Sequence, residues 1–545
     1  MMTNHHNPFH QGELEAQRRA NVGDVASWAG GFIRDHMPDQ HRDFFTALPF
    51  LVVAGGDSAG RPWVTLMEGR EGFIRSPDRH SLKVDANPHH QDPLHDTFAP
   101  GSSVGMLGIE LSTRRRNRLN GIVTSSGKTL AIEVRQSFGN CPQYIQEREW
   151  SREPLYDIPK AQVSRQLDAR QKAMVAAADT FFIGTGSFGA NGQPSSNGYD
   201  ASHRGGPSGF VRVTADGTLL IPDYAGNKYF NTIGNLLRDP RVGLVFVEFE
   251  TGRLLHITGR ARIDWAPVGS HDPNARRMIE VTVDEVIDRP AALALRWRRD
   301  DGAQRRLKVV DKVQESGGIT SFHLASVDGS ALAPFKAGQY LPLDLKVPGQ
   351  ADVVARTYSL SGAPDAATYR ISVKREHLGV ASNHLASDVH IGATIETRPP
   401  SGDFVIPDDV SPLVLVSVGV GVTPMLSMLH ASAAIGSDRP VWFVHGVRNG
   451  REHAFGGEVD RLVASRPNIM RRVFYSAPLP TDTKGETFDA AGRVGADDLI
   501  SLDAGPDAHY LLCGPEHFLS AVRTDLEQAG VSQDHIHVEA FGPVG

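Results

Sequence analysis

A glycine-rich segment near residue 420 has the residue types that hold phosphate groups. Gly419-Val420-Gly421-Val422-Thr423-Pro424 follows the apolar run Leu413–Val418 and precedes Met425–Ala434, which has the composition of a helix. Glycines permit a tight turn and a close backbone approach, and the N–H groups that begin a helix attract an anion. An ordinary strand-to-helix connection can have the same sequence, so this motif indicates a phosphate site only when neighbouring motifs support it.

Further motifs upstream could bind an aromatic, phosphate-bearing cofactor. Arg356-Thr357-Tyr358-Ser359 combines an arginine for a phosphate, a flat tyrosine ring and a hydroxyl that can hydrogen-bond a ring edge. Tyr340 precedes this motif, and Gly379-Val380-Ala381-Ser382 has the form of a helix start suited to a second phosphate.

Two more motifs lie near the C-terminus, Cys513-Gly514-Pro515 and Glu539-Ala540-Phe541-Gly542. Simpler interpretations exist for single residues here. Tyr340 and Phe541 could be core aromatics, and an isolated Cys513 is more often a small buried apolar residue than a catalytic one. No base stands near Cys513 in sequence, so nothing indicates a nucleophile.

The elements that must position these motifs change type along the chain. Residues 303–408 are rich in short strand-like runs. In residues 409–545, the strand-like runs Leu413–Val418, Val441–Val444 and His509–Leu512 alternate with helical segments. That alternation predicts a parallel sheet in an α/β domain.

Taken together, residues 303–545 resemble the ferredoxin–NADP reductase superfamily, and most closely the reductase module of flavohaemoglobins. The resemblance implies an FAD-binding β-barrel at 303–408 and a nicotinamide-binding α/β domain at 409–545. It also implies that a hydride passes from NADH or NADPH to FAD. Arg448 and Arg451 could receive the 2′-phosphate of NADPH or be solvated loop charges, so the nucleotide preference stays open.

The resemblance also implies residue roles. The FAD-binding residues would be Tyr340, Arg356, Thr357, Tyr358, Ser359, Gly379, Val380, Ala381 and Ser382. The dinucleotide would be positioned by Gly419, Val420, Gly421, Val422, Thr423, Pro424, Cys513, Gly514 and Pro515. Glu539, Ala540, Phe541 and Gly542 would lie beside the flavin.

Within that set, Tyr358, Ser359, Cys513, Glu539 and Phe541 would act at the reacting ring. Arg356 would hold the pyrophosphate, Tyr358 would stack on the isoalloxazine, and Glu539 would tune its potential. Flavohaemoglobins commonly carry cysteine where this chain has Ala540, so any role at that position would fall to the backbone.

The N-terminal half contains an internal repeat. Val104-Gly105-Met106 recurs 138 residues later as Val242-Gly243-Leu244, and Asn120-Gly121-Ile122 recurs at the same offset as Thr258-Gly259-Arg260. Two earlier landmarks, at Gly60-Arg61-Pro62 and Gly72-Phe73-Ile74-Arg75, recur at offsets of 132 and 137. The pattern predicts two tandem split β-barrels, at residues 41–160 and 161–290, with a helix over 164–178 between them.

This repeated unit resembles the FMN-binding split barrel of pyridoxamine 5′-phosphate oxidase-like proteins. By that resemblance, Lys228 is the leading phosphate ligand of the second copy, with Asn227 beside it and Arg204 as a further anion contact. The first copy lacks the lysine, so we expect one FMN between the repeats, near Lys228. The alternative is that the barrels are ligand-free.

Several charged segments receive a structural interpretation. Residues 1–40 are taken as a helical or flexible N-terminal segment and 291–302 as a solvated linker. Arg114–Arg118 is interpreted as the exposed tip of a hairpin. The histidines at 89, 90 and 95 are assigned to a loop and to no metal site.

Composition excludes several classes of protein. The formal charge of −7, from 56 basic and 63 acidic residues, argues against a nucleic-acid binder. Two cysteines cannot form a disulfide framework or a four-cysteine iron–sulfur cluster.

The apolar stretch 412–429 carries Gly419, Gly421 and Pro424, which favours a buried strand, a turn and a helix over a membrane span. A cytoplasmic protein without a signal peptide is expected.

The sequence therefore predicts an NAD(P)H-dependent flavoprotein oxidoreductase whose electrons pass from FAD to a ligand of the barrels or to a diffusible acceptor. One alternative is a stand-alone reductase of oxygen, quinone or free flavin, with the barrels only pairing as a homodimer. Another is a flavin- or haem-binding redox sensor.

Overall fold

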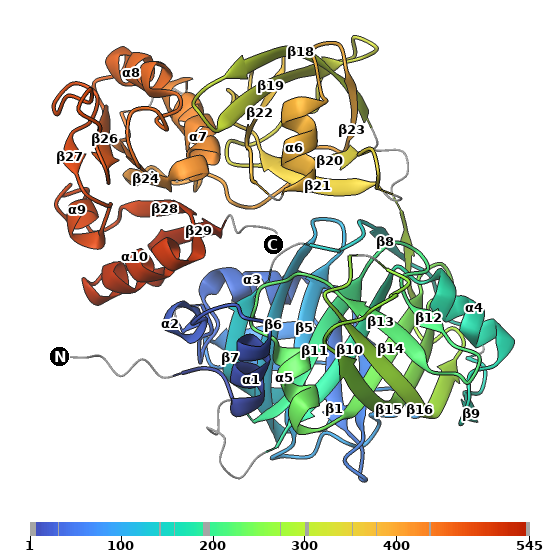
Figure 1. The fold of residues 1–545 in the computed structure, drawn as a ribbon. Coiled ribbons are helices and arrows are strands. Elements are labelled where there is room, and N and C mark those ends of the chain that lie inside the picture. The colour runs from blue at the N-terminus through green and yellow to red at the C-terminus, as the bar shows by residue number, and fades with distance from the viewer. Residues whose placement is uncertain are drawn as a thin grey trace. The chain divides into compact units, whose positions relative to one another are not determined.

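The computed structural model describes residues 7–30, 32–140, 143–156, 158–188, 197–272, 274–299, 305–350, 353–377, 379–434 and 438–540. The chain divides into an N-terminal unit, residues 1–300, and a C-terminal unit, residues 301–545 (Figure 1). Cys141, the landmark Gly192-Gln193-Pro194, Phe541 and Gly542 lie outside the described residues.

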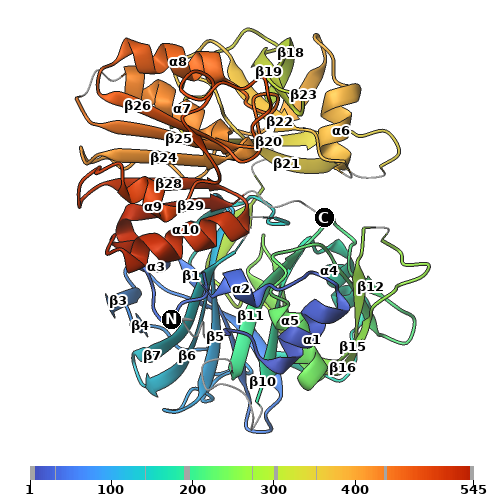
Figure 2. The same cartoon turned by 60° about the vertical axis from the view of Figure 1, so that its left-hand side comes forward.

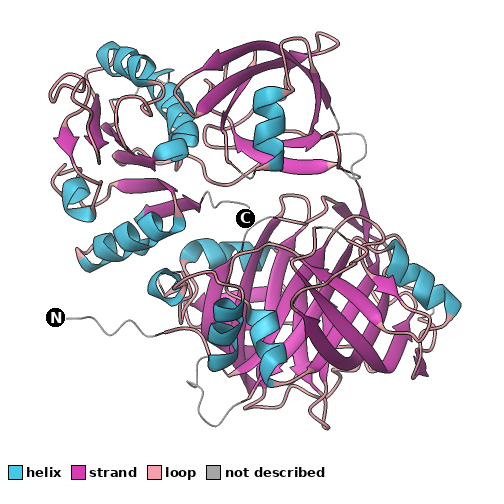
Figure 3. Cartoon of the chain, in the orientation of Figure 1, coloured by secondary structure: helices cyan, strands magenta, loops and turns pink. Residues whose placement is uncertain are grey.

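The N-terminal unit contains two antiparallel sheets with the same strand order. The first runs β2-β1-β5-β6-β7-β4-β3 and the second runs β11-β10-β14-β15-β16-β13-β12 (Figures 1 and 3). The first is built from β1 (Phe50–Gly56), β2 (Pro62–Glu68), β3 (Ile74–Asp78), β4 (Ser81–Val84), β5 (Ser103–Glu110), β6 (Arg115–Ser125) and β7 (Leu130–Gly139). The second is built from β10 (Thr180–Ser187), β11 (Gly198–Gly205), β12 (Arg212–Val213), β13 (Leu219–Asp223), β14 (Arg241–Glu248), β15 (Arg253–Asp264) and β16 (Arg277–Arg289). The predicted duplication is confirmed by this shared order.

Three helices precede the first barrel: α1 (Gln11–Arg19), α2 (Ala26–Ala29) and α3 (Asp39–Ala47). Helix α4 (Ala169–Ala177) separates the two barrels, and α5 (Asn231–Arg238) lies within the second, between β13 and β14. The helix predicted over 164–178 begins later, at Ala169, because Asp168 and Gln171 form a reciprocal capping box. The residues before it form β9 (Gln162–Ser164), which pairs with β16.

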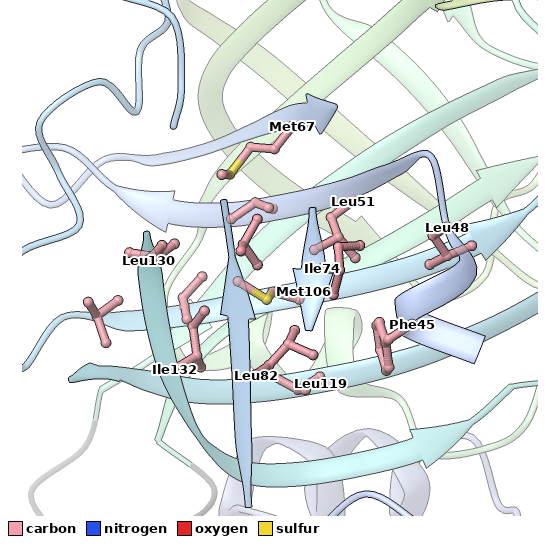
Figure 4. Packing of buried hydrophobic residues seen from close by; sticks show 14 of the residues in the cluster. Phe45, Leu48, Leu51, Met67, Ile74, Leu82, Met106, Leu119, Leu130 and Ile132 are labelled. Atoms are coloured by element: carbon pink, nitrogen blue, oxygen red, sulfur yellow. The ribbon is translucent and has the colours of Figure 1, made fainter. Parts of the chain in front are cut away.

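Each barrel has its own apolar core. The first packs residues such as Leu51, Met106 and Leu119 (Figure 4). A further cluster draws on both repeats, joining Phe50 and Val52 to Phe182 and Val245. Burial of apolar surface between the repeats therefore holds them together as one unit.

The solvated linker predicted at 291–302 is wrong for residues 291–299. Leu295–Arg298 forms β17, which pairs with β8 (Glu149–Arg152). Trp297 is 1% exposed and packs edge-on against Phe50. Leu295 and Trp297 alternate with Arg296 and Arg298, so the apolar and the charged side chains point to opposite faces of the strand. The many arginines made this alternation hard to recognise in the sequence.

The C-terminal unit joins an antiparallel sheet to a parallel one (Figures 2 and 3). The antiparallel sheet has the order β21-β20-β23-β18-β19-β22 and contains β18 (Arg305–Gln314), β19 (Ile319–Ser326), β20 (Tyr340–Leu345), β21 (Val354–Ser359), β22 (Tyr369–Lys374) and β23 (Thr394–Thr397), with α6 (Val380–Ser387). The parallel sheet has the order β27-β26-β25-β24-β28-β29 and contains β24 (Leu413–Val418), β25 (Val441–Val447), β26 (Ile469–Tyr475), β27 (Ala490–Ala491), β28 (His509–Gly514) and β29 (Ile536–Ala540).

Helices cover both faces of the parallel sheet. They are the short turn η2 (Gly419–Gly421), α7 (Val422–Ala434), α8 (Gly456–Ser465), α9 (Ala496–Ile500), α10 (Glu516–Gln528) and the turn η3 (Gln533–His535). The predicted fold class, β-barrels followed by a parallel α/β domain, is confirmed. The apolar stretch 412–429 folds as β24, η2 and the start of α7. Within the described residues, no helix combines the length and the apolarity that crossing a membrane requires.

Candidate functional site

Strand β21 presents the Arg356–Ser359 motif with alternating orientation. Arg356 and Tyr358 share one face, and Thr357 and Ser359 share the other. Burial raises the pKa of Tyr358 to about 12, so its phenol stays neutral. The half-buried Arg356 guanidinium donates to the Ala355 carbonyl at 2.8 Å and faces no carboxylate within the described part of the chain. A guanidinium that faces no carboxylate can bind a phosphate group.

A serine that the sequence did not single out lies beside Tyr340. Tyr340 pairs with Ser359 on β21 and exchanges backbone hydrogen bonds with Ser401, at 2.9 and 3.0 Å. The Ser401 hydroxyl is buried, and it has no hydrogen-bond partner among the described residues. Gly402 follows at φ +119°, where a Cβ would lie 3.0 Å from the Tyr340 ring. The Ser401 hydroxyl without a partner and the Tyr340 ring, beside which Gly402 places no side chain, fit a polar aromatic ligand.

Helix α6 begins at the predicted phosphate motif and lies near β20 and β21 in both views (Figures 1 and 2). A Cβ on Gly379 would lie 2.4 Å from the Ser382 hydroxyl, so a side chain there would displace that hydroxyl. Gly379 as N-cap contributes no side-chain hydrogen bond, and the first N–H groups of α6 therefore remain available to an anion.

The two nicotinamide motifs meet at one edge of the parallel sheet. Strands β24 and β28 are neighbours, with Ser417 opposite Cys513. A Cβ on Gly421 would lie 2.2 Å from the Cys513 carbonyl oxygen, so the two turns touch through their backbones. The carboxyl edge of a parallel sheet is where α/β domains bind their ligands.

Glu539 adds a titratable group at this edge. It lies opposite Cys513 in the β28–β29 pair. Withdrawal of its carboxyl group from water raises the pKa of Glu539 to about 7, and the charge of Asp403 adds to the effect. Burial also raises the pKa of the Cys513 thiol, with Glu539 contributing, so the thiol stays protonated. The arrangement offers a proton reservoir and no nucleophile.

An ion-pair cluster links the barrel to the α/β domain, and no local sequence pattern indicates it. Arg370 on β22 donates to both carboxylate oxygens of Glu458 on α8, at 2.9 and 2.8 Å. His430 on α7 contacts the same carboxylate at 2.5 Å. Burial alone would raise the pKa of Glu458, but the hydrogen bonds from His430 and Arg370 outweigh it and lower the pKa to about 2.

We expect this cluster to make the reductase unit sensitive to acid. The pKa of Glu458 is lower in the folded than in the unfolded state, so the carboxylate stabilises the fold above about pH 4.5. That stabilisation, about 1–3 kcal/mol, is lost as the pH falls toward about 2. Glu458→Gln should lower the unfolding free energy at neutral pH, and the difference from wild type should shrink on acidification. Denaturant unfolding at neutral and acidic pH measures these free energies, with the exposed Glu396→Gln as control. A difference between Glu458→Gln and wild type that does not change with pH would contradict the assignment.

A cavity of about 420 Å³ opens at the carboxyl ends of β25 and β26. Arg451 lines it and Arg448 does not. Three carboxylates also line it, those of Asp460, Asp482 and Glu486. Of the two arginines that could either receive a 2′-phosphate or be solvated loop charges, Arg451 is therefore the one placed at a cavity.

In the N-terminal unit, the structure groups Lys228 and Asn227 with residues of the first repeat. Asn227 donates to the Asn140 side chain at 2.9 Å, and Lys228 adopts a left-handed φ of 65°. Arg204, the expected second anion contact, is instead paired with Asp223 at 2.5 Å. Asp223 also binds Arg277, so a single carboxylate is shared by two guanidinium groups and one positive charge remains in excess.

The exposed tip predicted at Arg114–Arg118 is wrong. Arg115 begins β6, Arg116 contacts the ring of His203 at 2.9 Å, and Arg118 donates to Asn231 at 2.9 Å. Burial lowers the pKa of Arg118 to about 10. Arg116 and Arg118 therefore contact the second barrel, whereas Arg115 stays partly exposed and pairs with Glu110 of its own repeat.

Comparisons with known proteins agree with this division. Residues 306–406 match the family described as oxidoreductase FAD-binding domain, and residues 415–524 match the oxidoreductase NAD-binding domain. Residues 167–289 match the pyridoxamine 5′-phosphate oxidase family.

Individual relatives are similar over the reductase half. A flavohemoprotein of Deinococcus radiodurans is 43% identical over 239 residues, which cover 44% of this chain and 59% of the relative. A flavohemoprotein of Bordetella pertussis is 37% identical over 332 residues, 56% of this chain and 82% of the relative. The FAD/NAD-binding domain of a nitric oxide dioxygenase from Vibrio cholerae is 33% identical, with 44% of this chain and 99% of that chain covered at a TM-score of 0.40. The chain thus spans about 60% of the length of the first of these relatives.

Proposed function

We propose, on the premise that this chain belongs to the flavohemoprotein-related, ferredoxin–NADP reductase-type family of FAD- and NAD-binding oxidoreductases, that it passes electrons from NAD(P)H to an acceptor beyond FAD. FAD, when bound, accepts a hydride and can release electrons singly or in pairs. The acceptor is either a ligand of the N-terminal barrels, of the FMN class, or a diffusible molecule.

The protein's own residues have separable tasks in this proposal. Arg356 and the start of α6 bind phosphate, and Tyr358 with the Ser401 hydroxyl orients the ring system. Gly421 and the Cys513 carbonyl bring two turns close enough to seat a nicotinamide, and Glu539 holds a proton beside them.

One observation carries the proposal: the Gly419–Pro424 and Cys513–Pro515 turns touch through their backbones at the sheet edge where Glu539 lies. The test is to purify the chain, count flavins and titrate it anaerobically with NADH and with NADPH. Bleaching of one FAD per chain is expected. A chain without flavin, or a flavin that neither nucleotide reduces, would refute the proposal.

A redox sensor is the second candidate, since the cationic interface between the barrels could hold a ligand without turnover. Steady oxidation of NAD(P)H by excess acceptor distinguishes an enzyme from a sensor. The cytoplasm is the proposed location, because the buried Cys513 is a free thiol.

Glu539 should give flavin reduction a pH dependence. Below about pH 7 its carboxyl group carries a proton that it can donate, and above about pH 7 it is an anion. The rate of flavin reduction by NAD(P)H should therefore fall as the pH rises, with an apparent pKa of about 7. Stopped-flow measurement of Glu539→Gln should give a flat profile over that range with FAD content unchanged. If the inflection persists in Glu539→Gln, another group is responsible.

A further inference from the structure

A chain of three polar side chains joins the neighbouring strands β28 and β29 at the amino end of the parallel sheet (Figure 2). His509 begins β28, and its Nδ1 lies 3.0 Å from His537 Nε2 on β29. The other ring nitrogen of His509, Nε2, lies 2.7 Å from a carboxylate oxygen of Asp409, in the loop before β24. His537 is opposite Leu511, two residues after His509, so both rings project from one face of the sheet.

The carboxylate determines which nitrogen of each ring carries a proton. Because an ionised Asp409 can only accept, His509 donates through Nε2, and the Nδ1 of the neutral ring must then accept. His537 therefore donates through Nε2 and keeps its Nδ1 unprotonated. The hydrogen bonds run in one direction, from His537 through His509 to Asp409, and both are satisfied while the two rings are neutral.

The pair of histidines can take up one added proton but not two. A single imidazolium still leaves one donor and one acceptor between His509 Nδ1 and His537 Nε2, and the Asp409 carboxylate balances the added charge. When both rings are cations, two N–H groups face each other across 3.0 Å, so the hydrogen bond is replaced by a repulsion. The geometry of this contact therefore makes it sensitive to acid.

The surroundings of His537 oppose its protonation further. A third histidine, His535 in η3, has its ring centre 4.6 Å from that of His509, and its buried Nδ1 has no hydrogen-bond partner in the described part of the chain. Burial lowers the pKa of His537 to about 4, the charges of the two other histidines add to the effect, and Asp409 partly offsets it. A second proton on the cluster is therefore strongly disfavoured while the ring stays buried.

Charged groups on the neighbouring elements are mostly engaged in pairs. Arg439, just before β25, pairs with the other carboxylate oxygen of Asp409 at 3.4 Å. On α10, which packs against β28 and β29, Arg523 and Glu527 pair with each other at 3.0 Å. Turn η3 also carries Asp534. The carboxylate that contacts the histidine chain directly is that of Asp409.

Strand β29 connects this cluster to the reductase site. Glu539 follows His537 by two residues, projects from the same face of the strand and lies opposite Cys513. Two residues of a strand span about 7 Å, so a change in how β29 is held at His537 reaches Glu539 directly. The histidine pair is thus placed to control the position of a group at the nicotinamide turns without touching the cofactors.

We propose that Asp409, His509 and His537 form a clamp that positions β29, and with it Glu539, at the nicotinamide turns, and that a second proton on the histidine pair releases the strand. His509 and His537 are positioning residues, because they act on the reaction through Glu539. The proposal rests on the proposed function only in taking Glu539 as part of the reductase site.

The direction of the pH effect follows from the protons that each form binds. A histidine in a released strand has a pKa of about 6.5, whereas the pKa of His537 in the clamp is lowered to about 4. Between these limits the released form binds more protons, and for each proton it gains up to about tenfold over the clamped form per pH unit. Flavin reduction should therefore slow in acid, at a lower pH than the inflection expected of Glu539.

The test uses the full chain with FAD in place. Stopped-flow reduction of the flavin by NAD(P)H is followed from about pH 5 to about pH 8, and amide hydrogen exchange of residues 536–540 is measured without nucleotide. We expect the rate at the acid end to be at least about fivefold below its maximum, reversibly, with amide protection factors of β29 falling in parallel. Protection of β29 that is equal at both ends would overturn the proposal. Because exchange needs no nucleotide, this result is independent of whether NAD(P)H reduces the flavin.

A conservative variant identifies the histidine pair. The amide of His537→Gln can donate to His509 or accept from it but cannot gain a proton, so this variant should keep the neutral-pH rate and lose the acid decrease. His390→Gln, at an exposed histidine of the same unit, is the control and should keep the acid decrease. An acid decrease in His537→Gln equal to that of wild type would contradict the assignment.

Asp409→Asn gives a second measurement should His537→Gln fail to fold, because the Asp409 side chain is half exposed and tolerates replacement. Without the carboxylate, even the first proton on the histidine pair is uncompensated. The acid decrease in rate, and the loss of amide protection in β29, should therefore begin at a higher pH than in wild type. Profiles that coincide with those of wild type would show that Asp409 takes no part in the clamp and would refute it.

Discussion

Replacement of Arg356 by alanine is expected to give a folded protein that loses FAD during purification. The guanidinium of Arg356 is half-buried, has only a backbone carbonyl as its hydrogen-bond partner within the described residues, and projects from the same face of β21 as Tyr358. Charge-assisted hydrogen bonds to phosphate contribute about 1.5–3 kcal/mol, so FAD should bind about 10- to 100-fold more weakly. Flavin content and a titration of added FAD measure the loss.

Lys346→Ala is the matched control, because Lys346 is an exposed cation directly after the adjacent strand β20 and pairs with Glu396. That variant should retain FAD. If Arg356→Ala retained FAD at wild-type affinity, the pyrophosphate would have to bind elsewhere.

Replacement of Gly421 by valine should leave FAD bound but slow its reduction by NAD(P)H at least about 100-fold. The Cβ alone would stand 2.2 Å from the Cys513 carbonyl oxygen, so the two turns must separate. A displacement of this size at a hydride-transfer site misaligns the reacting atoms. Stopped-flow bleaching of the flavin measures the rate, and flavin content shows that the β-barrel is intact.

Gly421→Ala tests the same contact with a smaller side chain and should give an intermediate rate. Gly318→Ala is the control, because a Cβ at Gly318 would meet nothing within 4 Å. Full-rate reduction in Gly421→Val would place the nicotinamide away from these turns.

The sequence predicted the reductase half well because its signals are local. Leu413–Val418 is a short apolar run followed at once by a glycine turn, and parallel strands bring their carboxyl ends to one edge. Gly421 and Cys513 could therefore be expected to meet although 92 residues separate them.

Features that depend on contacts between distant elements could not be predicted. Ser401 matters because its hydroxyl is buried beside Tyr340, and nothing in its neighbours' sequence shows that burial. The contact of Arg370 with Glu458 likewise requires knowing how the barrel packs against α8.

The charged segments of the N-terminal half were misjudged for a related reason. Arginines are usually exposed, and Arg118 and Arg296 lie in runs that look solvated although both side chains are largely enclosed. Packing of one repeat against the other turns part of β6 into an interior surface, and Trp297 anchors β17 against the first barrel. Only the paired arrangement of the repeats shows which arginines are enclosed.

The shared apolar cluster between the repeats has a consequence for how the ligand site assembles. In a pair of separate subunits, a site at the interface dissolves when the protein is diluted, and every substitution appears twice. Here Phe50 and Phe182 join halves of a single chain, so the effective concentration of one barrel at the other does not depend on the amount of protein. The affinity of the site for its ligand should then be independent of protein concentration, and each barrel is free to change without its counterpart changing too.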